Sequence, residues 1–379
     1  MKKSGVLARA RDSISLRWEN YKALDQRSKA RWWGDFLVRN AIFFIIIVLV
    51  IYTAIYSQQQ GKKPFISFPS LLDIVRRTGA ALFLALGVGG IIVLTGTDLS
   101  AGRILGLTCC ISGSLLQKPL ADFSAKMWPD LVAPNILLVI LLVMAIGGII
   151  GAFNGFYVAK FNLHPFIVTL GTQLILYGAI LWYVTLGKQG GGPIGGLTEL
   201  YKTVVKGEII FGGTVVEGVK SGGVPVPYFV FYAIIATAIM WFIWNKTTLG
   251  KNMYAVGANP EAANVSGVSV MKTYILIFMI GGILYGFSGF IDGARIGSIT
   301  PTTGEGAELD AIAACVIGGV SFTGGTGKIS GIVTGVILLQ IIGISLMWLD
   351  VPSFMQNVIK GALILVSCAI DMRKYLAKK

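Results

Sequence analysis

Long apolar runs separated by short polar segments occupy most of the chain between residues 36 and 371. Most runs reach the roughly 17–25 residues that a helix needs to cross a hydrocarbon core about 30 Å thick. The pattern predicts an all-α fold, a polytopic transmembrane bundle with about ten spans and both termini cytoplasmic. The expected spans are 36–56, 77–96, 99–117, 134–159, 165–187, 227–246, 271–293, 308–321, 328–349 and 353–371.

Two stretches interrupt this pattern and predict discontinuous helices. The segment "LTGTDLSAGR" (94–103) leaves almost no room for a loop, and 301–330 places acidic residues beside a very short apolar run. Broken helices at membrane depth turn their polar ends toward protein or water rather than lipid. Ordinary tight turns at the membrane surface are the alternative.

Glycines also recur at four-residue intervals within the runs. Small residues at this spacing let helices approach closely inside a membrane. The two sets are Gly147, Gly151 and Gly155, and Gly289, Gly293 and Gly297.

Composition agrees with a membrane protein, since 54% of the 379 residues are hydrophobic and only 13% are charged. The formal net charge of +14 is best explained by basic residues that flank spans and set orientation. No basic domain rich in aromatic residues stands apart from the spans, so nucleic acid is not an expected partner. The basic arm 1–35 is expected in the cytoplasm, either as an amphipathic helix on lipid or as a solvated segment. This orientation places 188–226 outside, as a small external cap, and 247–270 inside.

The chain offers no enzyme constellation, so neither catalytic nor metal-binding residues are expected. The segment "GGTGKIS" (324–330) resembles a phosphate-binding loop but has Phe322 and Ile329 where such a loop needs Gly and Ser or Thr. We therefore expect no nucleotide site in this chain.

The polar segment "VGANPEAANVSGVSV" (256–270) predicts a short cytoplasmic helix at about 260–266. Asn259 is a favourable N-cap, and Pro260 is favourable at the first helical position. The negative charge of Glu261 suits the positive N-terminal end of the helix dipole, and Gly267 is a favourable residue at the helix C-terminus. Ala262 and Ala263 carry almost no side chain, which suits insertion into a partner's groove. A plain connector is the alternative.

Polar residues within or beside the spans are candidates for a translocation pathway. Each also has a structural interpretation, as a helix cap or an interhelical hydrogen bond. The candidates are Asp98, Ser100, Asn154, Thr169, Gln173, Glu308 and Asp310.

Four motifs in order resemble those of permease subunits of bacterial ABC monosaccharide importers of the ribose/galactose/xylose group. They are "GTDLSAGR" (96–103), "AVGANPEAANVSGV" (255–268), "ELDAIAACVIGGVSFTGGTG" (308–327) and "IKGALILVSCAID" (359–371). The resemblance covers about 36–375. The first motif, together with "WNKTTLGKNMYAVGANPEAA" (244–263), is most similar to the galactose/methyl-galactoside branch.

The resemblance implies an inner-membrane permease that acts as a homodimer and imports galactose, glucose or a methyl-galactoside by alternating access. It implies a separate ATPase subunit with two nucleotide-binding domains, which binds ATP and Mg, and a periplasmic sugar-binding protein; no cofactor is implied for this chain. The segment 260–266 would then be the coupling helix. The residues expected to couple to the ATPase are Gly257, Asn259, Pro260, Glu261, Ala262, Ala263 and Gly267.

Other functions remain open at this point. A related permease for ribose, xylose, a nucleoside or an autoinducer fits the same motifs. An ion-coupled secondary transporter is disfavoured because acidic residues are sparse within the spans. A membrane receptor or scaffold would not need the glycine-rich breaks.

Overall fold

The computed structural model describes residues 41–119, 126–188, 190–212, 214–216, 219–221 and 223–376. The basic arm 1–35 therefore lies outside the described residues. The long helices are α3 (Ala41–Gln59), α4 (Phe68–Val93), α5 (Ala101–Leu115), α6 (Ile136–Phe161), α7 (Pro165–Thr185), α9 (Tyr228–Lys246), α12 (Val270–Ile296), α14 (Ile329–Trp348) and α15 (Ser353–Leu376). Shorter helices are α8 (Glu199–Lys206), α10 (Thr248–Ala258), α11 (Pro260–Val265) and α13 (Ala307–Ile317).

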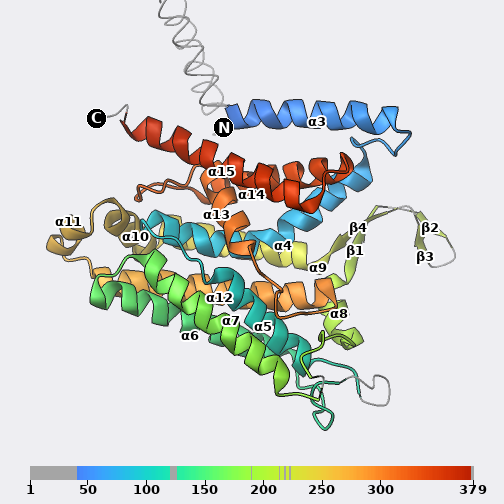
Figure 1. Cartoon of the computed structure of the whole chain (residues 1–379), viewed down its shortest axis with the longest axis horizontal. Coiled ribbons are helices and arrows are strands. Elements are labelled where there is room, and N and C mark those ends of the chain that lie inside the picture. Colours follow the sequence, from blue (N-terminus) through green and yellow to red (C-terminus); the bar gives the residue numbers. More distant parts are fainter. Residues whose placement is uncertain are drawn as a thin grey trace, which may run out of the picture.

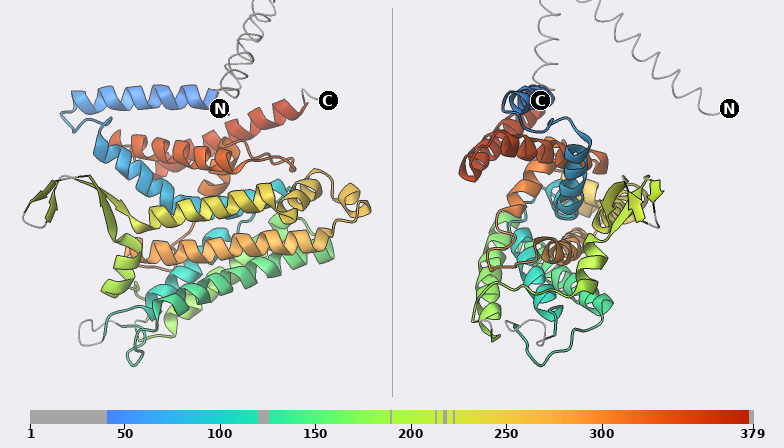
Figure 2. Two further views of the ribbon diagram at one scale, coloured as in Figure 1. Left: turned by 180° about the vertical axis from the view of Figure 1, so that it is seen from behind. Right: turned by 90° about the vertical axis from the view of Figure 1, so that its right-hand side faces the viewer.

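The long helices lie roughly alongside one another, as a helical membrane bundle requires (Figures 1 and 2). Five of them, α6, α7, α9, α12 and α14, are long and apolar enough to cross a membrane. In the most apolar stretch of α12, 61% of the residues are buried, against 28% in α6 and in α7. Helix α12 therefore forms the centre of the bundle, where it contacts α4, α5 and α6.

Glycines allow α12 and α6 to pack backbone against backbone. A Cβ added at Gly147 would lie 2.1 Å from the carbonyl oxygen of Gly282, and one at Gly151 would lie 2.1 Å from that of Phe278. The predicted close approach is thus confirmed for this set. In the second set Gly297 has another role, since it ends α12 with a φ of 77° and has open space around it.

Both predicted interruptions are breaks between helices. Helix α4 ends at Val93 and α5 begins at Ala101, and the segment between them contains the fully buried Asp98 and Ser100. Helix α13 has only 11 residues, a length of about 17 Å, so it cannot cross a core about 30 Å thick alone. The predicted span 308–321 was wrong in this respect, because α13 ends at Ile317 and residues 318–321 belong to the loop that follows.

The external cap predicted for 188–226 contains α8 and a ribbon of short strands. Strand β1 (Glu208–Phe211) pairs antiparallel with β4 (Val224–Pro227), and β2 (Thr214–Val216) with β3 (Val219–Ser221). Tyr201 anchors α8 to the bundle, because its hydroxyl donates a 2.5 Å hydrogen bond to the carbonyl oxygen of Phe290. The ribbon projects from the end of the molecule opposite α11 (Figure 1).

Candidate functional site

Helix α11 forms where the sequence predicts a short helix. The Asn259 side chain caps it by accepting a hydrogen bond from the backbone N–H of Ala262 at 2.9 Å. Pro260 occupies the first helical position, and Gly267, with a φ of 84°, follows the end of the helix. Figure 1 shows α10 and α11 protruding together at one end of the bundle.

The exposed face of α11 carries an apolar residue that the sequence reasoning missed. Pro260, Glu261 and Ala262 are exposed, whereas Ala263 is buried against the chain itself. Val265 is 89% exposed. Because residues four apart share a helix face, Val265 lies on the same side as Glu261. That spacing was the signal available in the sequence.

Gly257 lies on the inner side of α10, where it joins this segment to the rest of the bundle. A Cβ at Gly257 would lie 1.9 Å from the carbonyl oxygen of Val93, the last residue of α4. The same oxygen accepts a 2.9 Å hydrogen bond from the backbone N–H of Gly325. Tyr254 adds a 3.0 Å hydrogen bond from its hydroxyl to the carbonyl oxygen of Gly327. We call these five residues the glycine junction.

The glycine junction explains why glycines are present in the segment 324–330, which resembles a phosphate-binding loop. Its glycines allow the 318–328 loop to contact α4 and α10 through backbone atoms, and Gly324 and Gly325 have φ angles of 79° and 67°. Glycine adopts such positive φ angles without the cost that a Cβ imposes. The loop thus joins α10, the break after α4, and the α13–α14 pair.

Four of the predicted pathway residues belong to one buried polar network at the α4–α5 break. An Asp98 carboxylate oxygen accepts hydrogen bonds from the backbone N–H and the hydroxyl of Ser100, at 2.9 and 2.6 Å. The Asn154 amide donates to the Ser100 hydroxyl at 3.0 Å and accepts from Thr172 at 2.6 Å. Thr169 donates to the carbonyl oxygen of Thr97 on the same break. The network ties the break to α6 and α7.

The remaining predicted pathway residues lie elsewhere. Gln173 is half-buried on α7. Glu308 is 6% exposed and packs against α5, where a Cβ added at Gly102 would lie 2.0 Å from its carboxylate. Asp310 pairs with Lys360 of α15 at 2.8 Å and lines a cavity.

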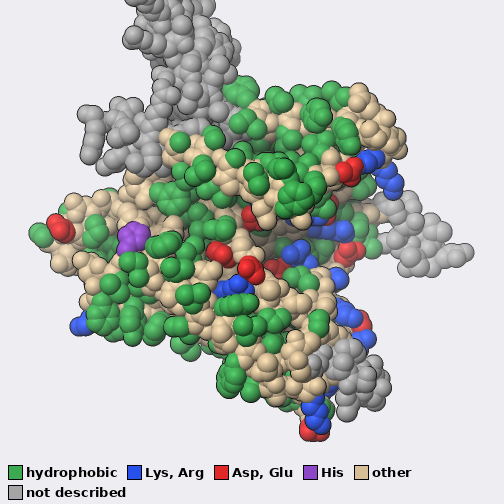
Figure 3. Space-filling view, in the orientation of Figure 1, with side chains coloured by type: hydrophobic (Ala, Val, Ile, Leu, Met, Phe, Trp, Pro, Cys, Tyr) green, Lys and Arg blue, Asp and Glu red, His purple; other side chains and the backbone are tan. Residues whose placement is uncertain are grey.

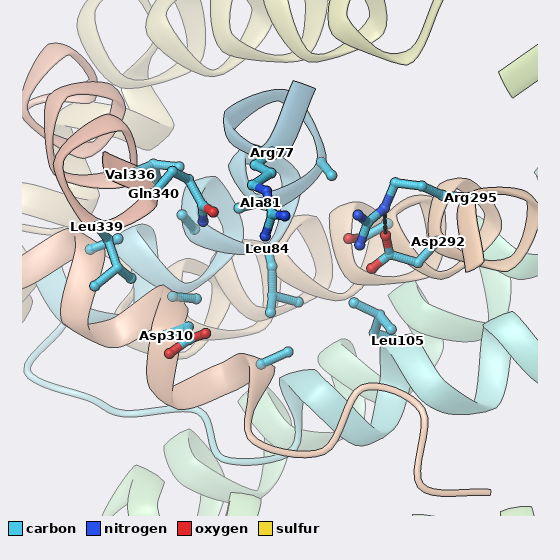
Figure 4. A pocket seen from close by; sticks show the side chains of 16 residues that line it. Arg77, Ala81, Leu84, Leu105, Asp292, Arg295, Asp310, Val336, Leu339 and Gln340 are labelled. Atoms are coloured by element: carbon cyan, nitrogen blue, oxygen red, sulfur yellow. Dashed lines mark hydrogen bonds and ion pairs between the residues drawn. The ribbon is translucent and has the colours of Figure 1, made fainter. Parts of the chain in front are cut away.

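That cavity of about 210 Å³ lies between α4, α5, α12, α13 and α14. Figure 4 shows Arg77, Asp292, Arg295, Asp310 and Gln340 around it, contributed by four different helices. Small residues of α4 and α13 complete much of the wall. The sequence reasoning missed all of these polar residues except Asp310, although charges inside long apolar helices are themselves a signal of a polar pathway.

A second hollow of about 310 Å³ adjoins the cavity at the ribbon end of the molecule, and we call it the vestibule. Arg77 and Arg295 line both spaces. Arg76, which lines only the vestibule, pairs with Glu208 of β1 at 2.8 Å. Figure 3 shows charged side chains gathered in the hollowed middle of one face, with hydrophobic side chains above and below.

A model of one family, described as branched-chain amino acid transport system / permease component, matches residues 70–368. The chain belongs to this permease family. With its apolar helices, it is a multi-pass permease of the inner membrane. A permease component of this family is not itself catalytic.

Relatives support the same assignment over almost the whole chain. The galactose/methyl galactoside import permease protein MglC of Escherichia coli (strain K12) is 42% identical over 335 residues, covering 88% of this chain and 95% of that protein. Its counterpart from Haemophilus influenzae is 41% identical over 346 residues, covering 91% and 97%. The ribose import permease protein RbsC of E. coli (strain K12) is 32% identical over 330 residues, covering 87% and 93%. No solved structure matches the chain.

Proposed function

We propose that this chain is the permease subunit of an ATP-driven importer that carries galactose, glucose or a methyl galactoside inward. The observation that carries the substrate assignment is the gap in identity between relatives. The sequence identity is 41–42% to galactose/methyl galactoside permeases but 32% to a ribose permease, over most of the chain in both cases. Ribose is the second candidate, because the ribose relative also aligns along nearly its full length.

Sugar competition separates these two candidates. Uptake of labelled galactose by the complete importer should fall when unlabelled glucose or methyl galactoside is added, and should be unaffected by the same concentration of ribose. Inhibition by ribose alone, with no effect of glucose, would assign the chain to the ribose type instead.

The proposed working unit contains two copies of this chain, an ATPase subunit with two nucleotide-binding domains, and a periplasmic sugar-binding protein. ATP and Mg bind the ATPase. The permease domain is 36–375, with 247–270 facing the ATPase and 188–226 facing the binding protein. Support comes from the placement of α11 and the ribbon at opposite ends of the bundle (Figure 1).

Helix α11 is the proposed coupling helix. A helix of six residues is unstable by itself in water, and its exposed Glu261, Ala262 and Val265 offer one charge and a small apolar surface to a groove. The glycine junction then links its displacement to α4, α13 and α14, which form walls of the cavity. This displacement would switch the cavity between outward- and inward-facing states.

The coupling role is tested by charge reversal at the exposed face. Glu261→Arg should abolish ATP-dependent uptake and weaken association with the ATPase, while the variant still assembles in the membrane. Asp130→Arg is the matched control, since it makes the same change at an exposed residue of the 126–135 segment, away from α11. Equal uptake by both variants would remove α11 from the coupling mechanism.

A further inference from the structure

The cavity between α4, α12, α13 and α14 carries four charged residues whose signs balance. Arg77 and Arg295 supply the positive charges, and Asp292 and Asp310 supply the negative ones. A site for an anion or a cation would carry an excess of the opposite sign, because opposite charges attract. The balance therefore favours an uncharged solute.

Each of these four residues already has an ion-pair partner. Arg295 pairs with Asp292 at 2.8 Å within α12, and Arg77 pairs with Asp73 at 3.0 Å within α4. Asp310 pairs with Lys360 at 2.8 Å. A zwitterion such as an amino acid would need one unpaired charge of each sign, whereas a hydroxyl needs only a donor or an acceptor. The pairing favours a neutral, hydroxyl-bearing solute.

Hydrogen-bonding groups nevertheless remain available within the cavity. A guanidinium has five N–H donors, and the bonds described above use only the Nε–H of Arg77 and of Arg295. The planar fork of the other N–H groups matches two adjacent oxygens. Figure 4 shows the Arg77 head group reaching into the middle of the cavity, with Asp292 and Arg295 on one side and Gln340 on the other. This arrangement suits adjacent hydroxyls on a small ring.

A sugar ring also needs an apolar surface for its C–H face, and small side chains provide it. The cavity wall includes six alanines of α4 and α13 whose methyl groups leave room for the C–H face of a ring: Ala80, Ala81, Ala85, Ala307, Ala311 and Ala314. The volume of about 210 Å³ is below the roughly 300–1,000 Å³ of pockets for drug-sized ligands. The space therefore selects a small molecule that has polar edges and an apolar face.

We propose that this cavity is a monosaccharide subsite carried within each copy of the chain. Sugar enters from the vestibule past Arg77 and Arg295, and its adjacent hydroxyls bind Arg77, Asp292 and Arg295 while its C–H face rests on the alanines. This subsite rests on the proposed function, because it is the place where the importer would hold its sugar during switching.

The test measures binding of labelled galactose to the permease–ATPase complex without the sugar-binding protein, so that the permease alone supplies the site. Galactose should bind weakly, and glucose should displace it whereas leucine should not. Asp292→Asn and Arg295→Gln should each weaken binding about tenfold or more, the usual effect of losing a hydrogen bond to a charged group. Arg76→Gln is the matched control, because Arg76 lines only the vestibule, and it should leave binding unchanged.

Gln340→Ala is a further test variant. It disturbs no ion pair of the cavity, and it should also weaken galactose binding. Absence of galactose binding to the wild-type complex, or equal binding by all four variants, would contradict the subsite. Displacement by leucine would identify a zwitterion site instead. Galactose uptake by the complete wild-type importer is measured in parallel. Normal uptake together with failed binding would overturn the subsite alone, whereas absent uptake would overturn the proposed function as well.

Discussion

Gly257 provides the sharpest test of how the coupling segment communicates with the bundle. In Gly257→Ala the new Cβ would lie 1.9 Å from the carbonyl oxygen of Val93 and 2.9 Å from the backbone nitrogen of Gly325. Both neighbours are backbone atoms, so no side-chain rotation relieves the contact. The new Cβ must push α4 and the 318–328 loop away from α10, and unequal displacement of the two stretches the 2.9 Å hydrogen bond that joins Gly325 to Val93.

The size of the effect follows from three contributions. Overpacking costs about 1–3 kcal/mol, and a weakened backbone hydrogen bond adds about 1 kcal/mol. The higher helix propensity of alanine offsets about 1 kcal/mol. The net destabilisation is therefore about 1–3 kcal/mol. This leaves the bundle folded but separates the backbones that meet at the glycine junction.

The assay compares ATP hydrolysis with sugar uptake for Gly257→Ala in proteoliposomes that contain the complete importer. We expect hydrolysis to persist and the amount of sugar moved per ATP to fall severalfold. Gly171→Ala is the matched control, because a Cβ at Gly171 of α7 meets nothing within 4 Å. A normal ratio of sugar to ATP in Gly257→Ala, with a lowered melting temperature, would refute transmission through the glycine junction.

Three further predictions concern local structure. Asn259→Ala removes the α11 cap and should destabilise that helix by about 1 kcal/mol, seen as faster hydrogen exchange at residues 261–265; Asn259→Asp should restore slow exchange. Thr172→Val leaves the buried Asn154 oxygen without its 2.6 Å donor and should cost about 1–3 kcal/mol in a chemical unfolding titration; an unchanged midpoint would contradict the network. Lys360→Gln breaks a partly exposed pair with Asp310 and should change stability by under about 1 kcal/mol in the same titration.

The helices could be predicted because they depend on local patterns. Apolar runs of sufficient length located α6, α7 and α12 within a few residues, and the Asn259-Pro260 pair located the start of α11. Helix α13 was predicted too long, because the sequence pattern of an apolar run with glycines does not distinguish a continuing helix from a loop. The packing of Gly324 beside the end of α4, and of Gly325 beside Ala258 of α10, decides between the two.

The cavity could not be predicted, because its residues come from helices far apart in the sequence. Arg77, Asp292 and Gln340 carry no local mark of a shared site, and only the packing of α4, α12 and α14 brings them together. Conversely, Asp98 and Asn154 are as polar as any cavity residue, but the structure places them in a buried network. Polarity within a membrane helix indicates a partner, and only the three-dimensional arrangement shows whether the partner is solute or protein.

Galactose uptake in proteoliposomes that contain this chain, its candidate ATPase and its candidate sugar-binding protein shows directly whether the chain is the permease of an ATP-driven importer. We expect uptake that requires ATP and all three components. Uptake by this chain alone, driven by a proton or sodium gradient with no ATPase present, would contradict it.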